Sequence, residues 1–197
     1  MQIIKSPNYN QRPKGIKIDM IIIHATHINK KDTIKKFLDP KSEVSSHYLI
    51  TKDGEVIYFV EDVNRAWHAG ISHWDGKDNL NDNSIGIEIE NDGEEDFSQK
   101  QYQILASLIS ELKIKHKDIK DSLILGHNEI ALSRKEDPGK QFLWKKLYDL
   151  GHGNYILHTA LKNDKILYKL GDHSDEILQL KNNLHSLLIY LKKMSFT

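Results

Sequence analysis

The run MIIIHA at residues 20–25 constrains the fold of this chain more than any other stretch. It forms the centre of a β-branched segment at residues 17–26. Strands that are buried on both faces have this pattern, and they occur in sheets that helices cover. With 197 residues, the chain is long enough for one such domain with a full core and an appendage.

The spacing of apolar residues predicts the other elements of the domain. The expected strands are residues 45–60 (a hairpin around Asp53-Gly54), 84–90 and 122–127, and the expected helices are residues 31–39, 98–116 and 142–150. Residues 1–15 are expected to be an extended arm and residues 65–83 a loop. In the first helix Ile34, Phe37 and Leu38 are predicted to share one side, and Ser98 is predicted to cap the second helix.

These elements define the fold class. We predict an α/β domain over residues 1–150, with a single mixed β-sheet flanked by helices. Gly151-His152-Gly153 is the expected boundary. Residues 151–197 are predicted to form a short helical C-terminal tail, because SDEILQLKNNLHSLLIYLKK is amphipathic at helical spacing.

Composition excludes several classes of function. The 28 basic and 28 acidic residues balance, so the basic footprint typical of a nucleic-acid-binding protein is missing. There is no cysteine, so any metal must be held by His, Asp, Glu or water. No apolar run approaches the roughly 20 residues of a membrane span, and no signal-like core begins the chain. We expect a cytoplasmic monomer from the chain as given, or a periplasmic one if a leader has been removed.

Three ionisable residues follow the predicted strands. His24 ends one buried strand, His127 ends another, and Asp137 lies ten residues further on, in the loop GHNEIALSRKEDPG. Functional groups collect at strand ends in α/β sheets. Two imidazoles and one carboxylate with an open fourth position make a catalytic zinc site. Pro138 and Gly139 could hold the Asp137 carboxylate at a fixed angle, because proline restricts the residue before it and glycine permits a sharp reversal.

From spacing alone, a structural role explains these residues equally well. A single histidine after a buried strand is more often a hydrogen-bonded core residue than a metal ligand. In SIGIEIE, Glu88 and Glu90 share one face of the predicted strand, opposite the isoleucines. Either glutamate could act as a general base, and either could belong to a solvated edge-strand face. The alternation does not choose between them.

Several sequence blocks together indicate a family. In order along the chain they are IIIHAT, SSHYLITKDGEVIYFV, RAWHAGISHW, NDNSIGIEIEN, and LILGHNEIALSRKEDPG followed by FLW. This series resembles the zinc-dependent N-acetylmuramoyl-L-alanine amidases related to bacteriophage lysozyme-amidase and the peptidoglycan recognition proteins. It is most similar to the bacterial anhydromuramyl-peptide amidases and covers residues 7–144. The resemblance implies a zinc hydrolase that cleaves the amide between (anhydro-)N-acetylmuramic acid and the L-alanine of the stem peptide.

The resemblance also implies roles for individual residues. His24, His127 and Asp137 would be the zinc ligands, Glu88 the catalytic acid/base and Lys135 its partner. The ammonium of Lys135 would lie beside the carbonyl of the bound substrate, where negative charge develops during the reaction.

Substrate contacts are expected from further residues of these blocks. His47 could contact substrate or zinc-bound water, while His68 could be structural and orient the loop of Trp67. Arg134 could pair with a substrate carboxylate. Trp74 could stack on a sugar, whereas Trp67 is expected to pack in the core.

Two questions of function stay open at this level. The alternative to an enzyme is a non-catalytic peptidoglycan recognition module on the same fold. Such modules typically lack one of the zinc-ligating residues, and all three are present in this sequence. In the tail, YKLGDHSDEILQLKNNLHSLLIY resembles the opening of a small helical peptidoglycan-binding domain, and a plain amphipathic helix is the alternative. The expected partner is peptidoglycan or a soluble muropeptide.

Overall fold

The computed structural model describes residues 2–155, 174–175 and 177–179. The chain divides into two units, residues 1–155 and residues 156–197, and the first contains the sheet. In the second unit Ser174 begins a helical turn, because its hydroxyl accepts from Ile177 N and its carbonyl from Leu178 N. Of the predicted tail, including the segment that resembles a peptidoglycan-binding domain, only residues 151–155, 174–175 and 177–179 are described. Among the described helices, none is long and apolar enough to cross a bilayer.

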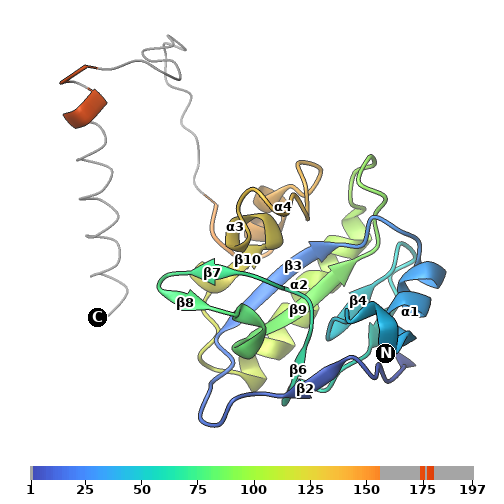
Figure 1. The fold of residues 1–197 in the computed structure, drawn as a ribbon. Helices are drawn as coiled ribbons and strands as arrows, with labels where there is room; N and C mark the ends of the chain where they lie inside the picture. The colour runs from blue at the N-terminus through green and yellow to red at the C-terminus, as the bar shows by residue number, and fades with distance from the viewer. Residues whose placement is uncertain (1, 156–173, 176, 180–197) are drawn as a thin grey trace. The chain divides into compact units, whose positions relative to one another are not determined.

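A six-stranded mixed sheet organises the first unit (Figure 1). Its strands lie in the order β1 (Gln2–Ile3), β5 (Val56–Tyr58), β4 (Tyr48–Ile50), β9 (Ser84–Ile89), β3 (Met20–Ala25) and β10 (Ile124–Gly126). Within this sheet β4 and β5 form an antiparallel hairpin, and the other neighbours run parallel. Gly54 in the hairpin turn has φ +82°, which favours glycine. The predicted α/β class with one mixed sheet is confirmed.

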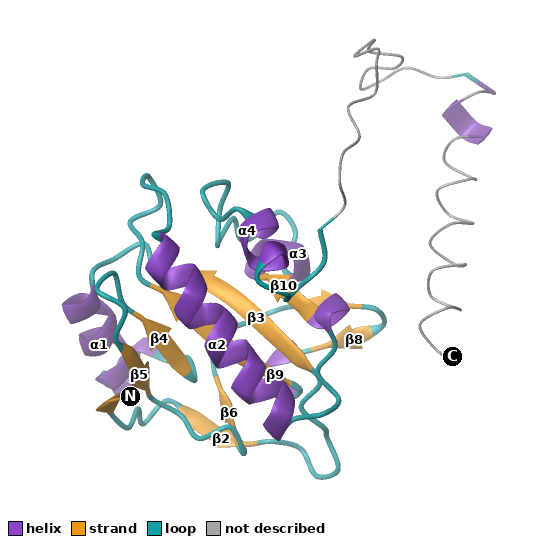
Figure 2. Ribbon diagram, turned by 180° about the vertical axis from the view of Figure 1, so that it is seen from behind, coloured by secondary structure: helices purple, strands orange, loops and turns teal. Residues whose placement is uncertain are grey.

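One face of the sheet is covered by α2 (Gln99–Lys115), which Figure 2 shows lying across it. The core between them consists of alternate isoleucines from two strands and one stripe of the helix: Ile21, Ile23, Ile85, Ile87, Tyr102, Leu105 and Ile109. α4 (Trp144–Asp149) joins the same core through Leu147. The helical spacing predicted for residues 98–116 is therefore confirmed.

The opposite face of the sheet carries shorter elements. α1 (Lys30–Leu38) packs through Phe37 in a cluster with residues of β4 and β5, and α3 (His127–Ile130) packs against β3. Side chains alternate along a strand, so His24 and Glu88 face this side while their isoleucine neighbours face α2.

Residues 65–83, predicted as a loop, contain short regular elements. These are β6 (Asn64–Ala66), which pairs with β2 (Tyr9–Gln11) of the N-terminal arm, the hairpin of β7 (His73–Trp74) and β8 (Lys77–Asp78), and a 3-10 turn at Leu80–Asp82; further 3-10 turns lie at Pro40–Ser42 and Asp121–Leu123. The prediction missed β6 because its partner β2 lies far away in the sequence, and a local pattern does not report such a pairing. It also missed the short β7–β8 hairpin, although the local turn signal Asp75-Gly76 joins its two strands.

The buried side of α1 is narrower than predicted. Phe37 is buried, but Leu38 is 39% exposed. Leu38 is the last residue of α1 and is not part of the cluster that contains Phe37 and Ile34. Thr33, one turn before Phe37, shares the buried face instead.

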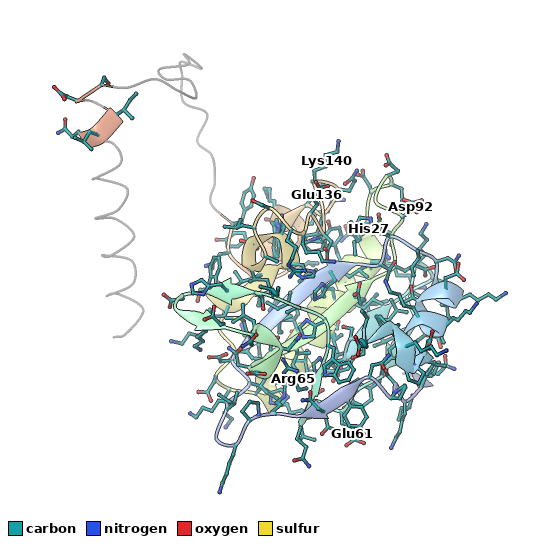
Figure 3. The ribbon with its side chains drawn as sticks, in the orientation of Figure 1. His27, Glu61, Arg65, Asp92, Glu136 and Lys140 are labelled. Carbon is teal, nitrogen blue, oxygen red and sulfur yellow. The ribbon has the colours of Figure 1, made fainter. Side chains whose placement is uncertain are left out.

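The two ends of the sheet carry different groups (Figure 3). His27, which follows β3, lies at the same end as Asp92, which follows β9, and Glu136, which lies in the loop after α3. Glu61 and Arg65 lie toward the opposite end. Strand ends that are separate in the sequence therefore meet at one place.

Ser98→Ala should lower the free energy of unfolding by about 1 kcal/mol, because it removes the cap of α2. Ser98 Oγ accepts from Gln101 N at 3.2 Å, and Gln101 Oε1 accepts from Ser98 N at 3.0 Å. Urea denaturation measures the change. Ser107→Ala is the control in the same helix, since Ser107 is exposed, and it should stay within about 0.5 kcal/mol of the parent. Equal losses in both variants would contradict the capping role.

Candidate active site

Parallel register brings predicted site residues together. His24 in β3 is the Cα partner of Glu88 in β9. On the other side of β3, Ile23 is the partner of Gly126, the last residue of β10. His127 is the next residue, so it emerges beside His24 at the end of the sheet.

The loop after α3 returns Asp137 to the same place. Asn128 N donates to the carbonyl oxygen of Asp137 at 2.8 Å, which ties the end of the loop to the first turn of α3. The peptide bond between Asp137 and Pro138 is cis, and Gly139 has φ +82°. Gly139 therefore turns the chain directly after the carboxylate, as predicted.

His24, His127 and Asp137 each point one atom at a single spot. His24 Nδ1 lies 3.0 Å from His127 Nδ1, and each of these nitrogens lies 3.1 Å from Asp137 Oδ2. All three residues are buried. The structure thus brings together the residues predicted as ligands, and the cluster could hold a metal ion.

The far side of the His127 ring determines where its proton lies. His127 Nε2 is 3.0 Å from the carbonyl oxygen of Ala69, which can only accept a hydrogen bond. The proton of the neutral ring is therefore on Nε2, and Nδ1 carries a lone pair.

A longer hydrogen-bond chain determines the state of the His24 ring. Ser84 Oγ donates its one proton to the carbonyl oxygen of Leu80, so it accepts from His68 Nε2 at 3.3 Å. His68 Nδ1 is then an acceptor for His24 Nε2 at 3.0 Å. His24 Nδ1 is left with a lone pair, as in His127.

Lone pairs on two nitrogens and one carboxylate oxygen thus face each other with no proton between them. Burial lowers the pKa of His24 to about 4, and the neighbouring His127 acts in the same direction, so the ring is neutral near pH 7. The arrangement is unfavourable unless a cation lies among the lone pairs. Two imidazoles and a carboxylate, without a thiolate, are a donor set that suits zinc and leaves a position open.

Glu88 faces a cavity of about 400 Å³ that the three clustered residues also line. Its Oε2 is buried and has no hydrogen-bond partner among the described residues. Burial raises the pKa of Glu88 to about 8, the charge of Asp137 acts in the same direction, and Lys36 and Lys135 oppose it. A carboxyl group with these surroundings at a cavity is suited to proton transfer.

Glu90, which the alternation left equivalent to Glu88, has different surroundings. Its Oε1 accepts from Lys30 N at 2.6 Å, at the start of α1, and its Oε2 accepts from Lys52 N at 2.8 Å. Both oxygens therefore hold the backbone of neighbouring segments. Glu88 faces the cavity, whereas Glu90 stabilises the elements around it.

Three cationic residues, Lys36, Arg134 and Lys135, line the same cavity. Arg134 donates to the carbonyl oxygens of Ala69 and Ile71, at 2.6 Å each, and so holds the loop that these residues form. Within the described part of the chain, none of the three cations forms an ion pair with a carboxylate. Their positive charge is therefore available to an anionic ligand.

Two residues predicted to contact substrate do not line this cavity. His47 is fully buried, Gly86 N donates to its Nδ1 at 3.0 Å, and Arg12 lies 3.0 Å from its Nε2. Burial, and then the charge of Arg12, lowers the pKa of His47 to about 3. Trp74 lies in β7 and packs against a core cluster. Trp67, expected to pack in the core, is only partly buried and lines the cavity instead.

Sequence reasoning missed Lys36 and Asn81. Lys35 and Lys36 are neighbours in the last turn of α1. Only Lys36 lines the cavity, and the way α1 packs on the sheet decides which of the two does so. Asn81 Oδ1 accepts from His68 N at 3.0 Å and from Ala69 N at 2.8 Å. It thus holds the segment to which the rings of His24 and His127 donate their Nε2 protons. The sequence signal for Asn81 was its place just before a predicted strand, where an asparagine side chain often forms hydrogen bonds with the backbone.

Comparison with known proteins agrees with this geometry. The family model described as N-acetylmuramoyl-L-alanine amidase matches residues 14–140. The 1,6-anhydro-N-acetylmuramyl-L-alanine amidase AmpD of Haemophilus influenzae is 33% identical over 161 residues, which cover 73% of this chain and 88% of that protein. The chain belongs to the N-acetylmuramoyl-L-alanine amidase family.

Solved structures share the fold of this amidase. The crystal structure of a selenomethionine derivative of AmpD has a TM-score of 0.69 at 31% identity and covers 76% of this chain and 93% of that chain. The complex of Escherichia coli AmiD with anhydro-N-acetylmuramic acid-L-Ala-D-γ-Glu-L-Lys has a TM-score of 0.65 at 32% identity and covers 74% of this chain and 62% of that chain. As a member of the family, the protein hydrolyses the amide bond between N-acetylmuramic acid, or its anhydro form, and L-alanine.

In this amidase, Glu90→Gln should lower stability and leave the turnover of folded protein unchanged. The amide has one acceptor oxygen, so the N–H of Lys30 or of Lys52 loses its partner, at about 1–3 kcal/mol. Urea denaturation and amide cleavage per folded molecule measure the two effects. Glu61→Gln, an exposed position at the opposite end, is the control and should change neither. Lost turnover at parental stability would make Glu90, rather than Glu88, the proton-transfer residue.

Proposed function

We propose that this amidase is a zinc enzyme acting on anhydro-muramyl peptides, with His24, His127 and Asp137 as metal ligands and Glu88 as general base and acid. One observation carries the proposal: converging lone pairs lie beside an unpartnered carboxyl oxygen, and all of them line one cavity. A metal, a water and a substrate carbonyl would use the bonding capacity that the protein leaves free there.

The protein's part in metal binding is to orient the ligands. When bound, zinc lowers the pKa of a coordinated water and polarises the substrate carbonyl. Ala69 O and His68 Nδ1 accept the Nε2 protons of the two imidazoles, which turns both Nδ1 atoms toward Asp137.

Glu88 is placed to move a proton at this spot. It neighbours His24 across the sheet, and its free Oε2 is at the cavity. A carboxylate there can accept a proton from the attacking water and return it to the alanine nitrogen as the amide bond breaks. The buried surroundings that raise its pKa to about 8 favour both halves of this transfer near neutral pH.

The cations that line the cavity can stabilise the negative charges of the substrate and of the transition state. Lys135, two residues before Asp137, can stabilise the negative charge that grows on the carbonyl oxygen, and this charge is larger in the transition state than in the substrate. Arg134 is held by two backbone carbonyls, and its remaining N–H groups can pair with a carboxylate of the stem peptide.

The relatives support an anhydro-muramyl peptide as the substrate. AmpD of Haemophilus influenzae is described as a 1,6-anhydro-N-acetylmuramyl-L-alanine amidase, and AmiD was solved with an anhydro-muramyl tripeptide described as its substrate. Such a substrate carries carboxylates, which suit the unpaired cations of the cavity.

Glu88→Gln should lower turnover about 10²–10⁴-fold and leave zinc near one per chain, because the amide keeps the shape of the side chain and removes the base. Elemental analysis measures zinc, and chromatography of soluble anhydro-muropeptides measures cleavage on the same preparation. Glu136→Gln, at an exposed glutamate directly before Asp137 in the same loop, is the control and should keep both values. Cleavage at the parental rate by Glu88→Gln would exclude Glu88 as the base.

Asp137→Ala and Lys135→Ala should separate metal binding from charge stabilisation. Asp137→Ala removes an anionic ligand, so zinc content and turnover should both fall. Lys135→Ala should keep zinc and lower turnover, with little change in substrate binding, because its charge acts mainly in the transition state. Lys140→Ala, an exposed lysine nearby, should change neither quantity. Full zinc content in Asp137→Ala would remove Asp137 from the ligand set.

The parent protein should release a peptide that begins with L-alanine from 1,6-anhydro-muramyl peptides. Mass spectrometry of products from soluble muropeptides and from intact sacculi identifies the bond and the preferred form of substrate. Cleavage of a peptide–peptide bond alone would reject the assignment. A parent protein that holds zinc, binds muropeptide and never cleaves it would be a recognition module instead.

A further inference from the structure

We propose that His68 is a positioning residue that sets the tautomer and orientation of the His24 ring, and that Ser84 sets His68 in turn. This role rests on the proposed function in one respect, because it takes His24 to be a metal ligand. The chain of hydrogen bonds from His24 through His68 and Ser84 to Leu80 is called the His68 relay below.

Both ring nitrogens of His68 are engaged in the relay. His68 Nδ1 is 3.0 Å from His24 Nε2, and His68 Nε2 is 3.3 Å from Ser84 Oγ. The rings of His68 and His24 meet edge to face, with centroids 5.1 Å apart. His68 is 7% exposed, and Asn81 holds its backbone N–H. The ring therefore has one orientation available and presents the same nitrogen to His24.

Protons in the relay run in one direction. The carbonyl of Leu80 can only accept, which takes the Ser84 proton and makes Ser84 Oγ the acceptor for His68. His68 Nδ1 must then accept from His24. The opposite arrangement would place a proton on His24 Nδ1, where it would occupy the position of a metal. The relay thus keeps the metal-facing nitrogen free of a proton.

Gly86 makes room for this ring in the sheet. A Cβ on residue 86 would lie 2.5 Å from His68 Cγ, which is far inside van der Waals contact. Glycine within a strand weakens it and marks a close approach of another group. Residue 86 lies in β9, the strand that also carries Glu88 and pairs with β3, and the approaching group is the His68 imidazole. The packing of His68 therefore depends on Gly86 in β9 as well as on the segment that carries His68.

A comparison of His68→Leu with His68→Asn in the full chain tests this role. Leucine fills space but cannot accept the His24 proton, whereas an asparagine Oδ1 can accept it from near the place of the histidine Nδ1. Zinc affinity, measured by competition with a chelator, should fall about 10–100-fold in His68→Leu and recover largely in His68→Asn. His73→Leu, at an exposed histidine in β7, is the matched control and should keep the parental affinity.

The nitrogen chemical shifts of the metal-free protein give a readout without zinc. In protein with ¹⁵N-labelled histidine, His24 should be protonated on Nε2 in the parent and shift toward Nδ1–H in His68→Leu. Ser84→Ala removes a single hydroxyl and should shift His24 in the same direction, with a smaller loss of zinc affinity. It carries the test if His68→Leu does not fold.

Different results separate the relay from the zinc assignment. Parental zinc affinity with an unchanged His24 tautomer in His68→Leu, or in Ser84→Ala if the leucine variant is unfolded, would overturn the relay. Equal losses of affinity in folded His68→Leu and His68→Asn would also overturn it, because bulk rather than hydrogen bonding would be responsible. A parent protein that binds no zinc but holds His24 as Nε2–H through His68 would support the relay and reject the zinc assignment.

Discussion

The parallel register of β3 with β9 and β10 is the constraint on which the site depends. It sets His24 against Glu88 and brings His127 out beside His24. A slip of one residue in either pairing would turn these side chains to the α2 face, because side chains alternate along a strand. The isoleucines that face α2 oppose such a slip, since it would remove them from the core. Hydrophobic burial on one face thus determines which polar groups meet on the other.

Hydrogen bonding divides the ionisable groups of that second face into two kinds. Glu90 places both oxygens on backbone N–H groups, and the Nε2 atoms of His24 and His127 have acceptors behind them. Among the described residues that line the cavity, the two Nδ1 atoms and Asp137 Oδ2 face one another without a proton, and the buried Glu88 Oε2 has no hydrogen-bond partner. Buried polar atoms are costly to leave unpaired. Their concentration at one cavity therefore indicates where the protein reserves bonding capacity for chemistry.

Elements that bury one face were predictable, and elements that depend on distant partners were not. The alternation in β9 and the helical repeat in α2 follow from burial on a single side, so a window of a few residues contains the information. β6 pairs with β2 from the N-terminal arm, and this pairing leaves no local pattern. The same limit applies to Trp67 and Trp74, because both have the chemistry to pack or to line a cavity. Their positions depend on how the segment between β6 and β8 folds back on the sheet.

The amino-acid sequence was sufficient for the α/β class, because buried strands leave marks along short stretches of chain, and its ordered blocks were sufficient for the family. The set of His24, His127 and Asp137 came from the resemblance of those blocks, since spacing alone did not separate these residues from structural ones. The strand alternation left Glu88 and Glu90 equivalent, since they share one face of β9, and only the resemblance to the family pointed to Glu88. The tertiary structure separates them. α1 and the turn between β4 and β5 bring two backbone N–H groups to the oxygens of Glu90, and no such donor reaches Glu88 Oε2 among the described residues. The docking of segments far apart in the sequence decides which of two like carboxylates stays free, and a strand pattern contains no information about that docking.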